Sequence, residues 1–194
     1  MELQMGRLGF STASEEETWF GVLVDNQDRL VASSFNPSRH TLNTHLKSIA
    51  RKMTETEPKP AAQKYAESMI ELFKGRDVIE PFSLNPELAT AYQEKVYEIL
   101  RKIPRARVTS YGMIAAAINS GPRAVGTAVA SNPWSLFVPC HRVVPSGLTV
   151  GNYGMSGSLD LEGSLMKRKL LRREGVPFRQ DRILPGALWE PRGG

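Results

Sequence analysis

Four prolines limit what the second half of this 194-residue chain can fold into. Proline has a fixed φ and no backbone N–H, so it suits the first turn of a helix and interrupts a helix interior. Pro86 and Pro122 stand where helices could begin, whereas Pro104 and Pro133 follow segments that would end there. We therefore expect short helices separated by turns after residue 85.

The first of these helices is predicted over residues 86–103. Asn85 can cap its first turn, and Glu87 complements the positive end of the helix dipole. One apolar stripe, typical of a helix packed on a core, runs along it. The stripe consists of Leu88, Tyr92, Val96, Ile99, Leu100 and Ile103.

Two shorter helices are predicted at 111–118 and 122–131, on either side of a turn at 119–121. Such a pair is typical of a helix-turn-helix motif. The second helix carries almost only small side chains and a single charge, at Arg123, so its backbone could approach another surface closely. Tight packing inside the domain is the alternative explanation.

The residues before 80 are predicted to form a small α/β unit with a hairpin and two helices. A breaker-rich stretch at 57–60 separates the helices, and Gly75 ends the second one. His40 and His45 fall within the first helix and are expected to be surface or packing residues. The predicted segments are strands at 18–24 and 29–35 and helices at 39–53 and 61–73.

These patterns divide the chain into an N-terminal domain at 1–80, a linker at 81–85, a second domain at 86–175 and a C-terminal tail at 176–194. The tail is rich in Pro and Gly, so it is expected to lie over the surface or fray.

Composition excludes several classes of protein. Cys140 is the only cysteine, so an intramolecular disulfide and a multi-cysteine metal site are ruled out, and with three histidines no metal or cofactor is expected. No apolar stretch approaches the roughly 18 to 20 residues of a membrane-spanning helix. Residues 1–10 lack the features of a signal peptide. We expect an intracellular protein with no membrane partner, cytoplasmic in a prokaryote or nuclear in a eukaryote.

Charge is distributed unevenly along the chain. There are 10 basic and 12 acidic residues before Pro86, and 15 basic and 8 acidic residues from Pro86 onward, so the two parts carry about −2 and +7. A basic half suggests a polyanion partner, and a solvated basic face is the alternative. The basic residues at 167–169 and 172–173, in a predicted helix at about 159–173, are expected to form such a face, with phosphate attraction as a second possibility.

Cys140 and His141 are the candidates for chemistry. A lone cysteine between apolar residues is often an inert small hydrophobe. An imidazole within reach, however, is the kind of base that a nucleophilic thiol requires. Their adjacency alone leaves both explanations open.

Five motifs in order distinguish the two explanations: Val108-Thr-Ser-Tyr111, Arg123-Ala-Val-Gly126, Asn132-Pro133, Pro139-Cys-His-Arg-Val-Val144 and Gly151-Asn-Tyr153. Over about residues 86–175 the chain resembles the O6-alkylguanine-DNA alkyltransferases, also called methylated-DNA–protein-cysteine methyltransferases. The resemblance implies an α/β, ribonuclease-H-like N-terminal domain followed by a mostly α, winged-helix-like DNA-binding domain.

The resemblance also implies roles for five residues in catalysis. Cys140 is the nucleophile that accepts the alkyl group, and His141 is the base that activates it through a bridging water. Glu174 orients His141, and the Asn132 side chain helps to hold the turn that carries the cysteine. Tyr111 donates a hydrogen bond to a guanine ring nitrogen.

Substrate and DNA contacts follow from the same resemblance. The backbone carbonyls of Cys140 and Val143 accept from the exocyclic amine of guanine, Tyr111 and Tyr153 bind the base, and Ser156 contacts O6. Arg123 fills the place of the nucleotide that is rotated out of the duplex, and the helix that carries it lies in the minor groove. The other expected DNA contacts are Ser110, Ala124, Gly126, Thr127 and Ala130.

The function implied is direct reversal of DNA damage, in which the protein, expected to be a monomer, transfers the alkyl group of O6-alkylguanine irreversibly to Cys140, once per molecule. Binding to double-stranded DNA would show no strong sequence preference. A non-catalytic protein that recognises alkylated DNA, and a helix-turn-helix regulator, are the alternatives.

Three features depart from the family pattern. Tyr153 and Glu174 are separated by 20 residues, so the loop around 154–162 is expected to be enlarged. Trp134-Ser135 follows Asn132-Pro133 where some members carry smaller residues or Pro, which bears on the width of the pocket. The zinc-binding cysteines of some members are absent from the N-terminal part.

Overall fold

The computed structural model describes residues 8–49, 56–78, 82–154 and 161–191. The N-terminal unit is a four-stranded sheet with the strand order β3-β2-β1-β4. Strands β1, β2 and β3 are antiparallel neighbours, and β4 runs parallel to β1. The strands are β1 (Leu8–Glu15), β2 (Thr18–Val24), β3 (Leu30–Asn36) and β4 (Thr56–Pro58).

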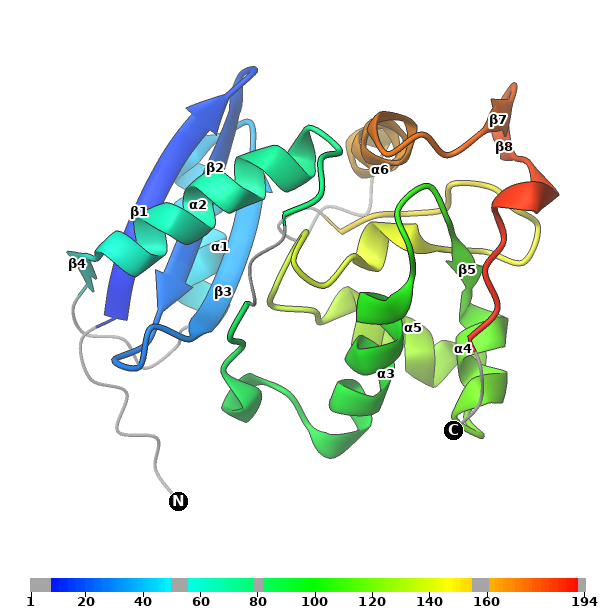
Figure 1. Ribbon diagram of the computed structural model, residues 1–194, viewed down its shortest axis with the longest axis horizontal. Coiled ribbons are helices and arrows are strands. Elements are labelled where there is room, and N and C mark those ends of the chain that lie inside the picture. The colour runs from blue at the N-terminus through cyan, green and yellow to red at the C-terminus, as the bar shows by residue number, and fades with distance from the viewer. Residues whose placement is uncertain (1–7, 50–55, 79–81, 155–160, 192–194) are drawn as a thin grey trace.

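Two helices, α1 (Arg39–Ile49) and α2 (Pro60–Phe73), cover opposite faces of this sheet (Figure 1). Alternating side chains of β2 explain the arrangement, because successive residues of a strand point to opposite faces. Val22 packs in the same buried cluster as residues of α2, whereas Leu23 packs in the same cluster as Leu42 and Leu46 of α1.

The predicted hairpin at 18–24 and 29–35 is confirmed as β2 and β3. Two strands were not predicted. β1 is only half buried along most of its length, so it lacks the hydrophobic alternation that marks a strand. The stretch at 57–60 is not a plain break, because β4 occupies residues 56–58 at the edge of the sheet, where a proline such as Pro58 is tolerated.

The helix predicted from residue 86 begins later, at Ala91, and this is a correction. Asn85 caps only a short 3-10 turn, Pro86–Leu88, by accepting a hydrogen bond from the Glu87 backbone N–H. α3 (Ala91–Lys102) starts at a reciprocal cap, in which the Thr90 side chain and the Gln93 side chain each accept from the other's backbone N–H. This capping box pairs two backbone donors at once and so defines the helix start.

The two short helices around a turn are present as α4 (Tyr111–Ala117) and α5 (Pro122–Ala130). They pack against each other, and α5 also packs against α3. β5 (Thr109–Ser110), which precedes α4, pairs in parallel with β6 (Val143–Val144). The 3-10 turn Cys140–Arg142 leads directly into β6.

The chain ends with α6 (Leu161–Arg173), a hairpin of β7 (Phe178–Arg179) and β8 (Arg182–Ile183), and the 3-10 turn Pro185–Ala187. Of the two outcomes expected for the tail, its described part packs and does not fray. Val176, Ile183 and Ala187 are buried in a cluster with side chains from three other segments. The Trp189 backbone N–H donates to the Val108 carbonyl at 2.8 Å.

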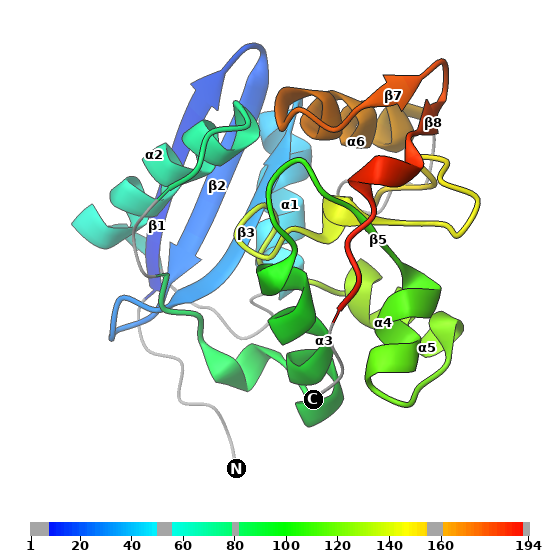
Figure 2. The same ribbon diagram turned by 45° about the vertical axis from the view of Figure 1, so that its right-hand side comes forward.

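The basic residues of α6 do not form one solvated face, contrary to expectation. Lys167 is 1% exposed, and Lys169 and Arg173 both form ion pairs with Glu16 in the turn between β1 and β2. Figure 2 shows α6 lying beside that end of the sheet. Two of the five basic residues therefore join α6 to the N-terminal unit. No helix in the described part of the chain is long and apolar enough to cross a membrane.

Candidate active site

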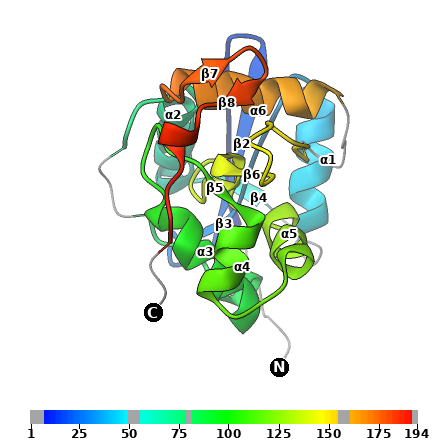
Figure 3. The ribbon, with the colours of Figure 1, turned by 90° about the vertical axis from the view of Figure 1, so that its right-hand side faces the viewer.

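Cys140 lines a cleft of about 350 Å³. The cleft is lined by residues of α1 and α5 together with residues of the segment that carries the cysteine. Figure 3 shows both helices to the right of β6, the strand that follows the cysteine. Cys140 is 8% exposed. Six of the predicted site residues line this cleft, namely Tyr111, Gly126, Ala130, Asn132, Cys140 and Tyr153.

Asn132 holds the loop that leads to the cysteine. Its Nδ2 donates to the Val138 carbonyl at 2.9 Å, and its Oδ1 accepts from the Trp134 backbone N–H at 3.0 Å. The side chain thus bridges the two ends of the segment 132–138. Trp134, which was expected to affect the width of the pocket, instead packs edge-on against Tyr97 in the core. Ser135 lines the cleft.

His141 and Glu174 form a buried pair beside the cysteine. The distance from His141 Nε2 to Glu174 Oε1 is 2.8 Å, and the two side chains are 2% and 5% exposed. His141 Nδ1 is buried and has no hydrogen-bond partner among the described residues. Nδ1 is therefore the ring nitrogen that is left to take a proton, while Nε2 is held by the carboxylate.

Arg142 shares the same carboxylate, a contact that the sequence analysis missed. Its Nε donates to Glu174 Oε2 at 2.9 Å, its Nη2 donates to Oε1 at 2.8 Å, and its Nη1 donates to the Ile103 carbonyl at 2.7 Å. Burial alone would raise the pKa of Glu174, but His141 and Arg142 together lower it to about 2. Glu174 is consequently an anion at neutral pH. The arginine was present in the Pro139–Val144 motif, but only its contact shows its use.

Two tyrosines line the cleft together with Cys140. The Cys140 thiol is 3.8 Å from the Tyr153 hydroxyl, within the range of a weak S–H···O hydrogen bond. Tyr111 is the first residue of α4 and is partly buried. Burial and the nearby Cys140 charge raise the pKa of both phenols. Both therefore keep their protons at neutral pH and remain hydrogen-bond donors.

Lys167 is a second residue that the sequence analysis missed. Its Nζ donates to the Val143 carbonyl at 2.7 Å, and its side chain also lines the cleft. Burial lowers its pKa to about 8. A signal was available, because Lys167 precedes Glu174 by seven residues, and two turns of a helix place such residues on one face. The Val143 carbonyl, expected to bind guanine, thus already accepts one hydrogen bond, and a carbonyl oxygen has two lone pairs.

The exposed face of α5 carries the expected DNA contacts. Arg123, Ala124, Thr127 and Ala130 are exposed, while Val125, Ala128 and Val129 face the core. Gly126 is partly exposed and lines the cleft.

Two other expected contacts differ from this pattern. Ser110 is buried, and its hydroxyl accepts from the Met113 backbone N–H as the cap of α4. Its contact with DNA stays a prediction. Ser156 and most of the enlarged loop lie outside the described residues. Among the described residues, no group of three or more His, Cys, Asp or Glu side chains could hold a metal ion.

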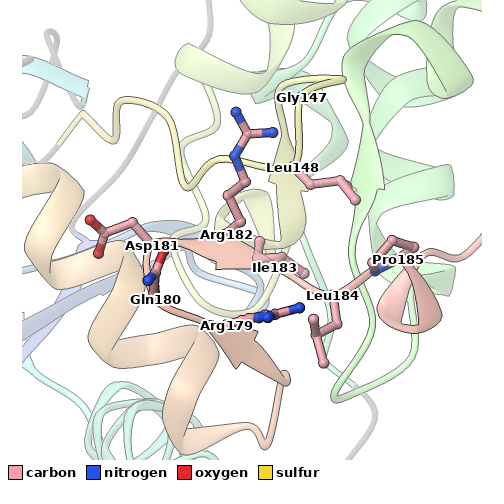
Figure 4. A pocket seen from close by; sticks show the side chains of 9 residues that line it. All are labelled: Gly147, Leu148, Arg179, Gln180, Asp181, Arg182, Ile183, Leu184 and Pro185. Atoms are coloured by element: carbon pink, nitrogen blue, oxygen red, sulfur yellow. The ribbon is translucent and has the colours of Figure 1, made fainter.

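A second cleft lies at the β7–β8 hairpin (Figure 4). Its lining includes Arg179, Arg182 and Leu148. Asp181, which also lines it, pairs with Arg168 of α6. Because this cleft has no nucleophile and no buried ionisable group, the Cys140 cleft is the candidate active site.

The chain is similar to known proteins. Residues 91–176 match the family model for the DNA-binding domain of 6-O-methylguanine DNA methyltransferase. The methylated-DNA–protein-cysteine methyltransferase of Archaeoglobus fulgidus is 40% identical over 114 residues, which cover 58% of this chain and 74% of that protein. The protein of the same name from Thermococcus sibiricus is 32% identical over 171 residues, covering 84% of this chain and 91% of its relative.

Solved structures show the same likeness. The crystal structure of O6-methylguanine-DNA methyltransferase from Pyrococcus kodakaraensis has a TM-score of 0.66 and 32% identity, covering 87% of this chain and 99% of that one. Mycobacterium tuberculosis OGT in complex with DNA also has a TM-score of 0.66, with 25% identity over 86% of this chain and 92% of that one. The matched structures share the α/β N-terminal part and the helical part that follows it.

Proposed function

The chain belongs to the methylated-DNA–protein-cysteine methyltransferase family, and from this premise we propose that it repairs O6-alkylguanine in DNA by moving the alkyl group to its own Cys140. One observation carries the assignment to this residue. The only cysteine of the chain is buried in a cleft beside a His141–Glu174 pair and next to the exposed face of α5.

The proposed reaction is a displacement at carbon. The Cys140 thiolate attacks the carbon attached to guanine O6, and the S–C bond forms while the C–O bond breaks. The electron pair of that bond stays with guanine, which then takes up a proton. The reaction needs no further reactant, because the sulfur gains the alkyl group and loses a proton, while guanine loses the alkyl group and gains a proton. The thioether product is stable, so each molecule acts once.

The buried polar groups fit the two proton movements. The thiol proton passes to His141 Nδ1, through a bridging water, and the Glu174 anion stabilises the imidazolium that forms. Tyr111 donates a hydrogen bond to the guanine ring, where negative charge builds on the leaving base. When Lys167 is protonated, its side chain adds a positive charge near the sulfur.

DNA is the proposed partner, bound through the exposed face of α5 in the minor groove. The small side chains at Ala124, Gly126, Thr127 and Ala130 permit a close approach of the helix backbone. An alkyl group on O6 is out of reach inside a duplex, so the nucleotide must rotate into the cleft at a cost of a few kcal/mol. Arg123, the second residue of α5, would fill the vacated position. Phosphate contacts would make binding weaken with salt.

The finer description of the fold belongs to the same proposal. A sheet of three antiparallel strands with a parallel fourth strand beside β1 supports a ribonuclease-H-like N-terminal unit. The α4–α5 pair, flanked by the paired strands β5 before it and β6 after it, supports a winged-helix-like second unit. We propose that the protein acts on DNA as a monomer.

Mass spectrometry of the intact protein tests the function. After incubation with a short duplex that carries one O6-methylguanine, we expect the protein to gain one methyl group, on the peptide that contains Cys140. Cys140→Ser should abolish the gain and leave DNA binding almost unchanged. Binding without a gain in mass would indicate a recognition protein, and preference for one operator sequence over alkylated DNA would indicate a regulator.

A further inference from the structure

One residue of the N-terminal unit reaches the cleft that holds Cys140. Of the described residues that line this cleft, His45 on α1 is the only one that precedes residue 111. The sequence predicted a surface or packing role for it. Figure 3 shows α1 on the same side of β6 as α5, the helix whose residues line the other part of the cleft. His45 therefore belongs to a cleft wall built by a different unit from the one that carries the chemistry.

The position of His45 is set by close packing of α1 on the sheet. Its helix neighbours Leu42 and Leu46 are buried, and a Cβ at Gly21 would come within 2.5 Å of the Leu46 Cδ1 atom. The glycine thus allows α1 to lie close against β2. The His45 Nδ1 is also 2.8 Å from the Ser34 hydroxyl, and Ser34 is 3% exposed on β3. His45 is therefore held in place at its backbone, by the packing of α1, and at its ring, by the Ser34 hydroxyl.

His45 contributes a flat, uncharged imidazole ring to the cleft wall. Burial lowers the pKa of His45, so the imidazole is uncharged at neutral pH. One ring nitrogen is engaged with Ser34, and Nε2 is the remaining polar atom. The cleft volume of about 350 Å³ is near the lower end of the range of about 300 to 1,000 Å³ that small-molecule sites occupy. The His45 ring is part of the wall of this space, so it takes up room that a bulky substituent on a bound guanine would otherwise use.

We propose that His45 limits the size of the O6 substituent that Cys140 can accept. This inference rests on the proposed function, because it assigns a specificity role at the same cleft. It makes the N-terminal unit a part of the substrate pocket, in addition to its place in the core. His45 is a specificity-determining residue here and takes no part in the proton movements.

The test compares two substituents in one sequence context. Transfer rates are measured for O6-methylguanine and O6-benzylguanine, each placed in the same short duplex, with the wild-type protein and with His45→Ala. We expect the ratio of the benzyl rate to the methyl rate to rise about tenfold in the variant, since one added or removed group in a pocket changes discrimination by roughly 10-fold or more. His40→Ala, on the exposed side of the same helix, should leave the ratio unchanged.

A larger residue gives the opposite expectation. His45→Trp fills space, so it should lower the ratio, and it keeps the test valid if the alanine variant does not fold. Circular dichroism establishes which variants are folded. A ratio within about twofold of wild type in a folded His45 variant would overturn the inference. Failure of the wild-type protein to take up the methyl group would instead overturn the proposed function itself.

Discussion

Glu174 receives three hydrogen bonds from two residues that follow Cys140 directly in the chain. His141 and Arg142 both donate to its carboxylate, and the side chain is 5% exposed. A buried anion in such contacts stabilises the folded state only while it is ionised. The same residue thus links the proposed proton transfer to the stability of the protein.

Glu174→Gln should therefore lower stability in a pH-dependent manner. The pKa of Glu174 falls from 4.5 to about 2 on folding, so its contribution is present above about pH 4.5 and is lost as the pH falls through about 2. That shift corresponds to at most about 3 kcal/mol. Urea unfolding at pH 7, 5, 4 and 3 should show a variant that is less stable at pH 7, with the difference from wild type narrowing toward pH 3.

Glu98→Gln, an exposed carboxylate on α3, is the matched control and should show no such narrowing. A difference between Glu174→Gln and wild type that stays constant down to pH 3 would contradict the assigned role of the carboxylate.

At the scale of single elements, α5 has one charged side chain on its exposed face. Arg123→Ala should slow transfer from duplex DNA by roughly tenfold or more. Rotating a nucleotide out of the duplex costs a few kcal/mol, and if Arg123 offsets about 1.4 kcal/mol of that cost, its loss raises the barrier enough for a tenfold slower rate. Transfer from free O6-benzylguanine, which needs no rotation, should change little. Rates with both substrates measure the difference.

Arg101→Ala removes the same charge from the exposed surface of α3 and serves as the control. If Arg123→Ala slowed both reactions equally, α5 would have another role, such as shaping the cleft.

The end of α2 depends on a glycine that contacts α6. Gly75 has φ +77°, and a Cβ there would collide with the backbone carbonyl of Arg173. Gly75→Ala should therefore cost at least about 2 kcal/mol of unfolding free energy, from left-handed backbone strain together with the collision. Gly147→Ala, where a Cβ meets open space, should change stability by much less. Thermal unfolding compares the two, and equal small effects would show that α2 and α6 are not held this closely.

At the scale of the whole molecule, one hydrophobic core crosses the predicted domain boundary. Phe20 and Phe73 of the N-terminal unit lie in the same buried cluster as Val96, Trp134 and Cys140 of the second. Polar contacts add to it, since the Trp134 indole donates to the Leu30 carbonyl at 2.8 Å and the Ser33 N–H donates to the Pro133 carbonyl at 2.9 Å.

The two units should therefore unfold together. We expect circular dichroism and tryptophan fluorescence to report a single transition with the same midpoint in urea, because Trp19 and Trp134 lie in different units. Trp134→Ala should lower the free energy of unfolding by about 3 to 5 kcal/mol, and the urea midpoint should fall to the same extent for both probes. Two separated transitions in the wild-type protein would show that the units are independent.

Local signals in the sequence determined many of the turns and helices of this protein and its candidate nucleophile. The prolines at 104 and 122 and the small side chains of α5 indicate turns and helices, and the motif around Cys140 indicates a candidate nucleophile. All of these signals come from residues that are close together in the chain. The start of α3 was placed too early because Asn85-Pro86-Glu87 and the Thr90–Gln93 cap are both valid helix starts. The helix starts at the Thr90–Gln93 cap, which satisfies two backbone N–H donors, whereas Asn85 satisfies one.

Only the tertiary structure decided which side chains share the cleft. Lys167 is buried against the Val143 carbonyl, and His45 reaches the cleft from the other unit. Neither follows from residue type, because lysine and histidine are found mostly on exposed or partly exposed surfaces. Burial and proximity arise when elements distant in sequence pack on one core, and no local pattern encodes that packing.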